Sequence, residues 1–325
     1  MAHTEPGTPR KGQFESLSRE ERKSLTHGDF WIPEDEREVY KLALVALNEA
    51  GIPYIVTGAY AIYEYTGIYR ATTDLDLFAE PRFIVPAMRV LRDVGFTTRL
   101  EQPHWLAKAK MGDLFVDLIF GMGNGLAMVD EDWYRYSTPA ILAAHPVRVA
   151  PAEELIWHRL FIYERHRQDM ADIAHLILCT GNRLDWRRLV DKSGEHWPLL
   201  LAQLQMYTYI YPESGDRIPR WVLRELLGRA TEEMNRPRSG ERVTRGTMVS
   251  RFSFAIDVNE WGLRDLREEM IRGAEQLPIV REIAHSGVWD ERSEMTEDYR
   301  RRLAAGEVGG SEPVYHSTEE AAPAE

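Results

Sequence analysis

The sequence is poor in cysteine and in long apolar runs. Its one cysteine, Cys179, excludes an internal disulfide, and a lone thiol is typical of a reducing compartment. No apolar run approaches the roughly 20 residues that a membrane helix needs. The first residues lack the apolar segment that is typical of a secretory signal. We therefore expect a cytoplasmic protein without a membrane partner.

Positive charge is also in short supply. Lysine and arginine together number 40, against 52 aspartate and glutamate residues, and the formal net charge is -12. This balance argues against broad, nonspecific DNA binding, although it is compatible with a local basic groove. Hydrophobic residues make up 44% of the chain and aromatic residues 10%, which is typical of a packed globular protein.

The ends of the chain differ in composition from its middle. Residues 1–32 carry charges of both signs and few large apolar groups, and residues 291–325 end in a small, polar, Gly/Pro-containing stretch. We expect a mobile arm at 1–32 and a disordered tail at 291–325. Between them the patterning predicts an α/β domain at 33–150 and a helical domain at 151–290.

The first half alternates between helical and strand periodicity. Proline and glycine bound three predicted helices, over residues 33–51, 59–65 and 83–94. Short β-rich runs predict strands over residues 54–57, 75–78, 97–100, 105–110, 114–120 and 146–150. Met111-Gly112-Asp113 is a hairpin signal between two of them. This order predicts an α+β fold with a mixed β-sheet flanked by helices.

The second half is mainly helical in its patterning. Periodicity predicts helices over residues 151–178, 186–209, 221–234, 257–275 and 280–284. We interpret one polar stripe of the first of these helices as a solvated face, with a nucleotide-orienting role as the alternative: Glu154, His158, Arg165, Asp169 and Asp172. Residues 242–254 are basic and aromatic; a solvated loop is the favoured interpretation, and a groove for RNA or a small molecule is the alternative.

Three aspartates stand out against these patterns. Asp74 and Asp76 are two residues apart in a run of strand character, so both side chains should lie on one face of the sheet. Such a pair repels unless water or a cation compensates it. Asp117 stands in an apolar strand, where an unpaired carboxylate is costly to bury. Because hard oxygen ligands suit Mg²⁺, the sequence predicts a metal site at these three residues.

A glycine turn precedes the aspartates. Gly58 follows a predicted strand and opens a helix, where a close backbone approach and the helix N-terminus favour a phosphate. A turn glycine needed only for its backbone conformation is the alternative. Lys108 and Lys110 lie one hairpin from Asp117; we interpret them as edge-strand lysines, with contact to phosphate or acceptor as the alternative.

The order of glycine turn, helix, Asp-x-Asp and third aspartate resembles the nucleotidyltransferase superfamily with the polymerase-beta-type fold. The match runs from Gly58-Ala59 through TDLD at 73–76 to Asp117. The sequence is most similar to small bacterial branches that contain antibiotic nucleotidyltransferases and toxin–antitoxin enzymes of the AbiEii type. This similarity rests on RATTDLD at residues 70–76 and on a later helix that carries Asp169 and Asp172.

The resemblance implies a nucleotidyltransferase-like sheet domain, followed by a mainly helical region. It implies an enzyme that moves a nucleoside monophosphate from an NTP to a hydroxyl acceptor, with Mg²⁺ or Mn²⁺ as cofactor. The acceptor stays open among tRNA or another RNA, a small molecule and a protein. The residues implied as catalytic and metal-binding are Asp74, Asp76 and Asp117. Those implied as nucleotide-binding are Gly58, Ala59, Arg70, Thr73 and Arg159.

Two residues depart from the family pattern. Ala59 stands where the turn has Gly or Ser, so a hydroxyl group toward the phosphate is missing. Arg159 stands where the later helix often carries Lys, which keeps the charge but changes its geometry. Both departures favour an alternative function, a catalytically silent module of the same fold that binds a protein, such as a toxin–antitoxin component. The three aspartates favour the enzyme.

Overall fold

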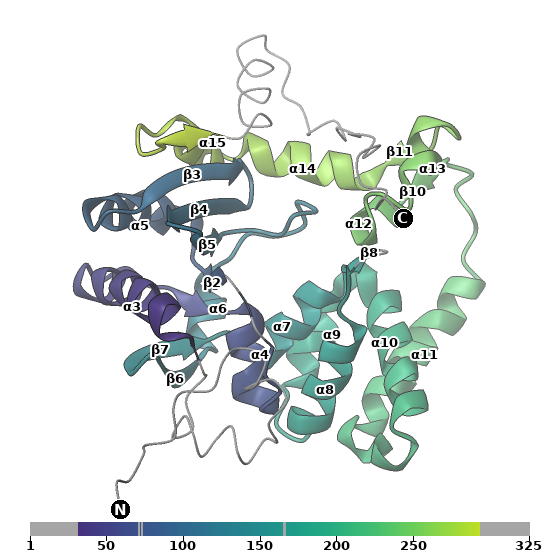
Figure 1. The fold of residues 1–325 in the computed structure, drawn as a ribbon. Coiled ribbons are helices and arrows are strands. Elements are labelled where there is room, and N and C mark those ends of the chain that lie inside the picture. Colours follow the sequence, from purple (N-terminus) through teal and green to yellow (C-terminus); the bar gives the residue numbers. More distant parts are fainter. Residues whose placement is uncertain (1–31, 71, 73, 165–166, 293–325) are drawn as a thin grey trace, which may run out of the picture.

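The computed structural model describes residues 32–70, 72, 74–164 and 167–292 (Figure 1). The predicted mobile arm lies outside these residues except for Ile32, and the predicted tail lies outside them from 293 onward. Both stay predictions. Thr73, predicted to bind nucleotide, is also outside the described residues.

A mixed eight-stranded sheet organises the N-terminal half, in the order β12-β3-β4-β5-β2-β1-β7-β6. Its strands are β1 (Ile55–Val56), β2 (Asp74–Phe78), β3 (Thr97–Gln102), β4 (Leu106–Met111), β5 (Leu114–Ile119), β6 (Thr138–Leu142), β7 (His145–Val149) and β12 (Glu291–Arg292). The β2–β5, β1–β7 and β12–β3 pairs are parallel, and the other pairs are antiparallel. The predicted mixed sheet is confirmed, with β6 and β12 as strands that the sequence did not predict.

Four helices accompany this sheet: α3 (Glu34–Glu49), α4 (Gly58–Thr66), α5 (Pro81–Asp93) and α6 (Glu131–Arg135). Helix α3 contacts α5 and β5, and α5 contacts β3 and β4, whereas α4 lies between β2 and the helical half. The core follows the alternation of the strands. Leu75 and Leu77 of β2 are fully buried, which leaves the intervening positions to the opposite face.

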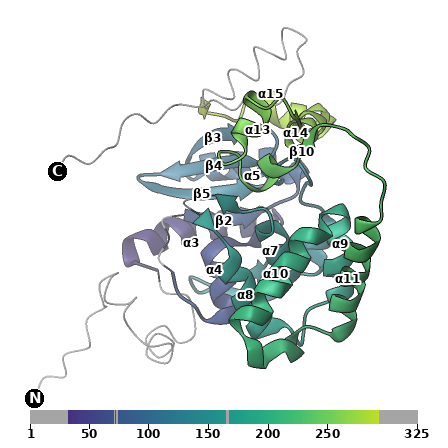
Figure 2. The same ribbon diagram turned by 90° about the vertical axis from the view of Figure 1, so that its right-hand side faces the viewer.

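The helical half begins with α7 (Ala152–Arg159) and continues through β8 (Tyr163–Glu164), β9 (Arg167–Gln168), α8 (Met170–Thr180), α9 (Trp186–Ser193), the 3-10 turn η1 (Gly194–His196), α10 (Trp197–Ile210), η2 (Pro212–Arg217) and α11 (Arg220–Met234). Helix α10 contacts α8, α9 and α11, so that these four helices form a bundle (Figures 1 and 2). The predicted helix over 221–234 is confirmed.

The prediction of one helix over 151–178 is wrong, because a β-hairpin separates α7 from α8. The interpretation of its polar stripe as a solvated face is also wrong: Glu154, Asp169 and Asp172 are buried. Buried charges need partners, and the turn back at the hairpin brings Asp169 and Asp172 to Arg159. The predicted helix over 186–209 is interrupted at Gly194, which has φ 47° and ψ -126°.

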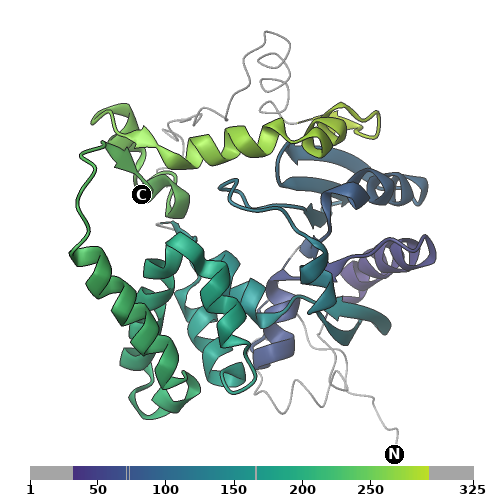
Figure 3. The ribbon, with the colours of Figure 1, turned by 180° about the vertical axis from the view of Figure 1, so that it is seen from behind.

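The C-terminal segment crosses back to the sheet. It contains β10 (Val243–Thr244), α12 (Gly246–Val249), α13 (Ala255–Asn259), β11 (Arg264–Asp265), α14 (Leu266–Gln276) and α15 (Pro278–His285). The prediction of one helix over 257–275 is wrong, since Gly262 at φ 65° lies between α13 and β11. Helix α15 packs on α5, and β12 pairs with β3 (Figure 3). The division at 150 and 290 stays a prediction.

Among the described residues, no helix combines the length and the apolar character required to cross a membrane.

Candidate functional site

The predicted carboxylates come together on two neighbouring strands. Strands β2 and β5 are parallel and adjacent, and their register places Asp76 directly opposite Asp117. Asp74 lies two residues before Asp76 on the same face of β2. One carboxylate oxygen from each of the three residues lies within 4.8 Å of the others. The sheet thus gathers three potential metal ligands at one place.

Two of the three carboxylates, those of Asp76 and Asp117, lie in an environment that raises the pKa. Burial raises the pKa of Asp76 to about 7, and repulsion by Asp74 and Asp117 adds to this effect. Burial also raises the pKa of Asp117. Its Oδ1 atom is buried and has no hydrogen-bond partner among the described residues. A divalent cation would offset the charge of these clustered carboxylates and would bind the oxygen that has no partner among the described residues.

Lys108 is the nearest cation to Asp117. Antiparallel pairing of β4 and β5 places the two residues opposite each other, and Nζ of Lys108 lies 2.7 Å from Oδ2 of Asp117. This ammonium lowers the pKa of Asp117 against the effect of burial. Strand β4 lies between β3 and β5, so the interpretation of Lys108 and Lys110 as edge-strand lysines is wrong for both, although Lys110 is exposed. The two-residue turn after Met111 sets the register of β4 against β5. The pairing of Lys108 with Asp117 therefore follows from the predicted hairpin.

Replacing Lys108 by methionine tests whether its ammonium compensates the carboxylates. The unfolding free energy of the metal-free protein should fall by about 1 kcal/mol, because a partly buried ion pair is lost. Mn²⁺ should raise the unfolding temperature more in the variant than in the wild type. Thermal unfolding with and without Mn²⁺ measures both effects. Lys110→Met is the matched control, since Lys110 lies near the same Phe115 ring. Equal behaviour of the two variants would contradict the assigned role.

Gly58 is where the chain passes closest to the aspartates. It opens α4 with φ +64°, and the preceding Thr57 N–H donates to the backbone oxygen of Asp76 at 2.9 Å. A Cβ atom at position 58 would lie 2.0 Å from Oδ2 of Asp76. A glycine is therefore required here both by backbone conformation and by close approach. The N-terminus of α4 consequently lies directly against the carboxylate cluster.

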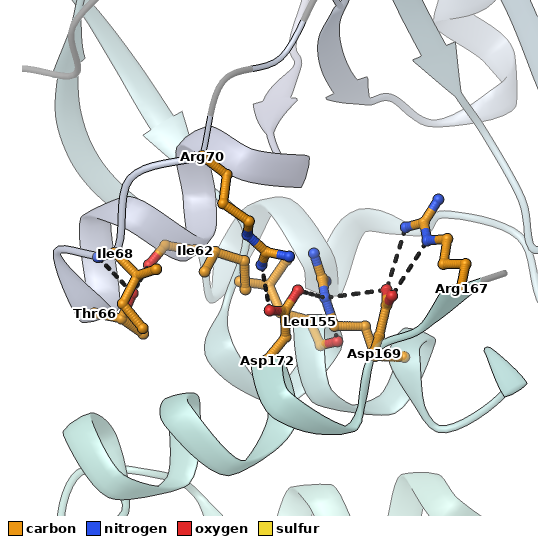
Figure 4. Close-up of polar contacts among 9 residues, drawn as sticks. Ile62, Thr66, Ile68, Arg70, Leu155, Arg167, Asp169 and Asp172 are labelled. Atoms are coloured by element: carbon orange, nitrogen blue, oxygen red, sulfur yellow. Dashed lines mark hydrogen bonds and ion pairs between the residues drawn. The ribbon is translucent and has the colours of Figure 1, made fainter. Parts of the chain in front are cut away.

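The two predicted phosphate-binding arginines belong to a network of ion pairs (Figure 4). Arg70 is hydrogen-bonded to Asp172. Nε of Arg159 lies 3.2 Å from Asp172 and 3.6 Å from Asp169. Arg167, which the sequence analysis did not single out, donates two hydrogen bonds of 3.2 Å to Asp169, and its side chain is 62% exposed. Through Asp172, Arg70 and Arg159 thus connect the segment after α4 and helix α7 to helix α8.

The carboxylates open into a cavity of about 590 Å³, which is large enough for a nucleotide-sized ligand. Predicted site residues that line it are Gly58, Asp74, Asp76, Asp117 and Arg159; Ala59 and Arg70 are not among the lining residues. Arg251 lines the cavity too, and it belongs to the segment 242–254, for which a groove was the alternative interpretation. The lining residues that were not predicted as site residues include Trp105, Arg167 and Arg267. Their contribution depends on contacts between distant segments, which no local pattern encodes.

His158 also faces this cavity. Burial and the neighbouring Arg159 lower the pKa of His158 to about 4, so its ring is neutral near pH 7. Its Nε2 atom is buried without a hydrogen-bond partner among the described residues. The segment 242–254, interpreted as a solvated loop, contributes Thr247 and Met248 to the cavity wall as buried residues, so that interpretation is wrong for them.

Of the comparisons with known proteins, only the one with solved structures found matches. No protein-family model matches the chain, and no curated protein matches it. The antibiotic-resistance factor ANT(2'')-Ia is 17% identical, with a TM-score of 0.39 over 55% of this chain and 100% of its own. The lincosamide antibiotic adenylyltransferase LnuA is 15% identical, with a TM-score of 0.33 over 45% and 96%.

A tRNA-processing enzyme also matches, with 14% identity and a TM-score of 0.26 over 85% of this chain and 81% of its own. One of these matching structures, LnuA, is an adenylyltransferase, which is a kind of nucleotidyltransferase. All three likenesses have TM-scores of 0.39 or less.

Proposed function

We propose that this protein is a metal-dependent nucleotidyltransferase, which moves a nucleoside monophosphate from an NTP to a hydroxyl acceptor and releases pyrophosphate. The observation that carries the proposal is the convergence of Asp74, Asp76 and Asp117 beside the Gly58 turn, inside a cavity of about 590 Å³. Tightly grouped carboxylates are costly in a folded protein unless something compensates their charge. A cation and a triphosphate would account for both the carboxylates and the helix N-terminus beside them.

The residues present fit a resident Mg²⁺ or Mn²⁺. Asp74, Asp76 and Asp117 would hold it, because their oxygens already lie within 4.8 Å of one another and Oδ1 of Asp117 lacks a partner among the described residues. Such a cation, when bound, would offset negative charge on the phosphates and on the attacking oxygen. Hard carboxylate oxygens are the ligands that both ions prefer.

The chain's own residues supply the remaining parts of the reaction. The turn at Gly58 and the N-terminus of α4 would bind triphosphate oxygens, since the backbone N–H groups and the dipole at a helix N-terminus favour an anion. Arg159 and Arg167 line the same cavity and would add positive charge to that binding. Arg70 would act through Asp172, which it shares with Arg159.

In the transfer step the acceptor oxygen forms a bond to the α-phosphorus, and the bond from that phosphorus to the pyrophosphate oxygen breaks. Asp117 would either complete the metal site or accept the hydroxyl proton; burial raises its pKa, which makes it a better base than an exposed aspartate. Thr73 and Ala59, adjacent in sequence to Asp74 and Gly58, stay predicted nucleotide-binding residues, although Ala59 is not among the residues that line the cavity. The acceptor would be tRNA, a small molecule or a protein.

Transfer of label from an α-labelled NTP tests this proposal. The wild type should transfer label only with Mg²⁺ or Mn²⁺, to an acceptor from a panel of tRNA, hydroxylated small molecules and protein extract. Asp117→Asn should lower the transfer rate at least tenfold while NTP binding changes less, because a base acts mainly in the transition state. Asp113→Asn, an exposed change in the neighbouring turn, is the control.

A second candidate function is a catalytically silent module of the same fold that binds a partner protein, such as a toxin–antitoxin component. The ion pair between Lys108 and Asp117 favours this function, because the ammonium group already neutralises one carboxylate oxygen that a metal ion would otherwise use. Ala59 also favours this second function, because it has no hydroxyl group to bind a phosphate. If wild type and Asp117→Asn both bind NTP and neither transfers label to any member of the panel, this second function becomes the better supported one.

A further inference from the structure

A second group of cationic residues lines the cavity that contains the aspartates. Arg251 follows α12, and Arg267 lies in the first turn of α14; both belong to the C-terminal segment and both face this cavity. The front and back views show α12 and the beginning of α14 apart from α4 (Figures 1 and 3). Cationic groups are thus present at a place that the glycine turn does not reach.

The backbone that carries these two arginines is held by hydrogen bonds. Glu164 of β8 accepts the N–H of Arg251 at 2.8 Å. Asp265 accepts the N–H of Arg267 at 2.9 Å and the hydroxyl of Thr247 at 2.6 Å, which joins α12 to α14. The two guanidinium groups therefore project from a fixed frame, which limits the entropy lost when they bind a ligand.

The guanidinium groups of Arg251 and Arg267 have hydrogen-bond donors that no described residue accepts. Among the described residues neither forms an ion pair, and Nε of Arg251 is buried without a hydrogen-bond partner. Arg267 donates one hydrogen bond of 2.9 Å to the backbone oxygen of Gly123. Burial and then repulsion by Arg251 lower the pKa of Arg267 to about 10, although nearby carboxylates, chiefly Asp265, oppose this shift. Like charges held together with unused donors favour the binding of an anion.

We propose that Arg251 and Arg267 form an anion-binding subsite, which selects a hydroxyl acceptor that carries a phosphate or carboxylate group. This inference rests on the proposed nucleotidyl transfer. The triphosphate would lie at Gly58 and Arg167, so the C-terminal arginines are left for the second substrate. Trp105 and Phe252, the latter 56% exposed, line the same cavity and would offer flat apolar surfaces to the body of that acceptor.

The subsite is tested with glucose and three of its derivatives, which differ in charge. The full chain is saturated with Mg²⁺ and α,β-methylene-ATP and titrated calorimetrically with glucose 6-phosphate, gluconate, glucose and glucosamine. Both anions should bind at least about tenfold more tightly than glucose, and glucosamine should bind most weakly. The first two probes distinguish a phosphate from a carboxylate as the preferred group.

Arg251→Ala should weaken the binding of both anions about tenfold or more and leave nucleotide binding unchanged, while Arg251→Lys should keep part of the preference. Arg267→Ala is an independent second variant if the first does not fold. Arg135→Ala is the matched control, since Arg135 is an exposed cation of α6. Wild-type affinity for glucose 6-phosphate in both alanine variants would overturn the proposal, as would equally tight binding of glucosamine.

Failure of this inference can be told apart from failure of the proposed function. If the wild type does not bind α,β-methylene-ATP with Mg²⁺, the proposed nucleotidyl transfer is contradicted, and the same titrations without nucleotide still test the anion subsite. If nucleotide and metal bind but the anions show no preference over glucose, only the subsite is contradicted.

Discussion

Replacing Asp76 by asparagine should stabilise the metal-free protein and abolish its binding of Mn²⁺. In the folded protein, burial and two neighbouring carboxylates raise the pKa of Asp76 from 3.8 to about 7. Ionised Asp76 therefore opposes folding, and its removal should raise the unfolding free energy near pH 8 by on the order of 2 kcal/mol. Calorimetric titration with Mn²⁺ measures the loss of binding, and denaturant unfolding of the metal-free proteins measures the gain in stability.

The pH dependence of this gain has a defined sign. A raised pKa means that the folded state favours protonated Asp76, so the cost of ionisation is absent below the unfolded value of 3.8 and grows as the pH rises toward 7. The advantage of Asp76→Asn should therefore be smaller near about pH 5 than near about pH 8. Asp113→Asn, in an exposed turn, should show neither effect. Equal Mn²⁺ binding by wild type and Asp76→Asn would mean that the metal site is elsewhere.

Replacing Gly58 by alanine should destabilise the protein by on the order of 3 kcal/mol and weaken the binding of NTP with Mg²⁺. The added Cβ would lie 2.0 Å from the Asp76 carboxylate, so either the turn or the aspartate must move. The positive φ of +64° adds strain that a glycine does not have. Denaturant unfolding measures the stability, and calorimetry of the folded variant measures nucleotide binding.

Gly51→Ala separates the two causes. Gly51 has φ +65°, nearly the same backbone conformation, but a Cβ there would meet nothing within 4 Å. This control should lose only about 1 kcal/mol, the usual cost of a side chain in the left-handed region. If Gly58→Ala is no more destabilising than Gly51→Ala, the contact with Asp76 does not decide the need for glycine at position 58.

Local pattern predicted the sheet half of the molecule well. Alternation in Asp74–Phe78 indicated which side chains of β2 enter the core, and the Met111-Gly112-Asp113 turn indicated the β4–β5 hairpin. Both depend on interactions between residues close in sequence, which a single sequence records. The helical half was predicted less well. The helical periodicity of the sequence continues through residues 160–169, so it predicted one unbroken helix. The structure turns back there, and this turn allows the ion pairs of Arg159 with Asp169 and Asp172.

The sequence by itself determined the Asp74–Asp76 pair and the glycine turn before it. Asp74 and Asp76 share a face because a strand alternates with a period of two. Asp117 joins them because β5 is the parallel neighbour of β2, which is a long-range pairing. Only the tertiary structure decided which cationic side chains lie near these carboxylates. Lys108 reaches Asp117 across a hairpin, Arg159 is engaged by carboxylates of α8 and its N-cap, and Arg251 enters the cavity from a segment more than a hundred residues away in sequence. Long-range contacts of this kind arise from packing of whole elements, which local propensity does not encode.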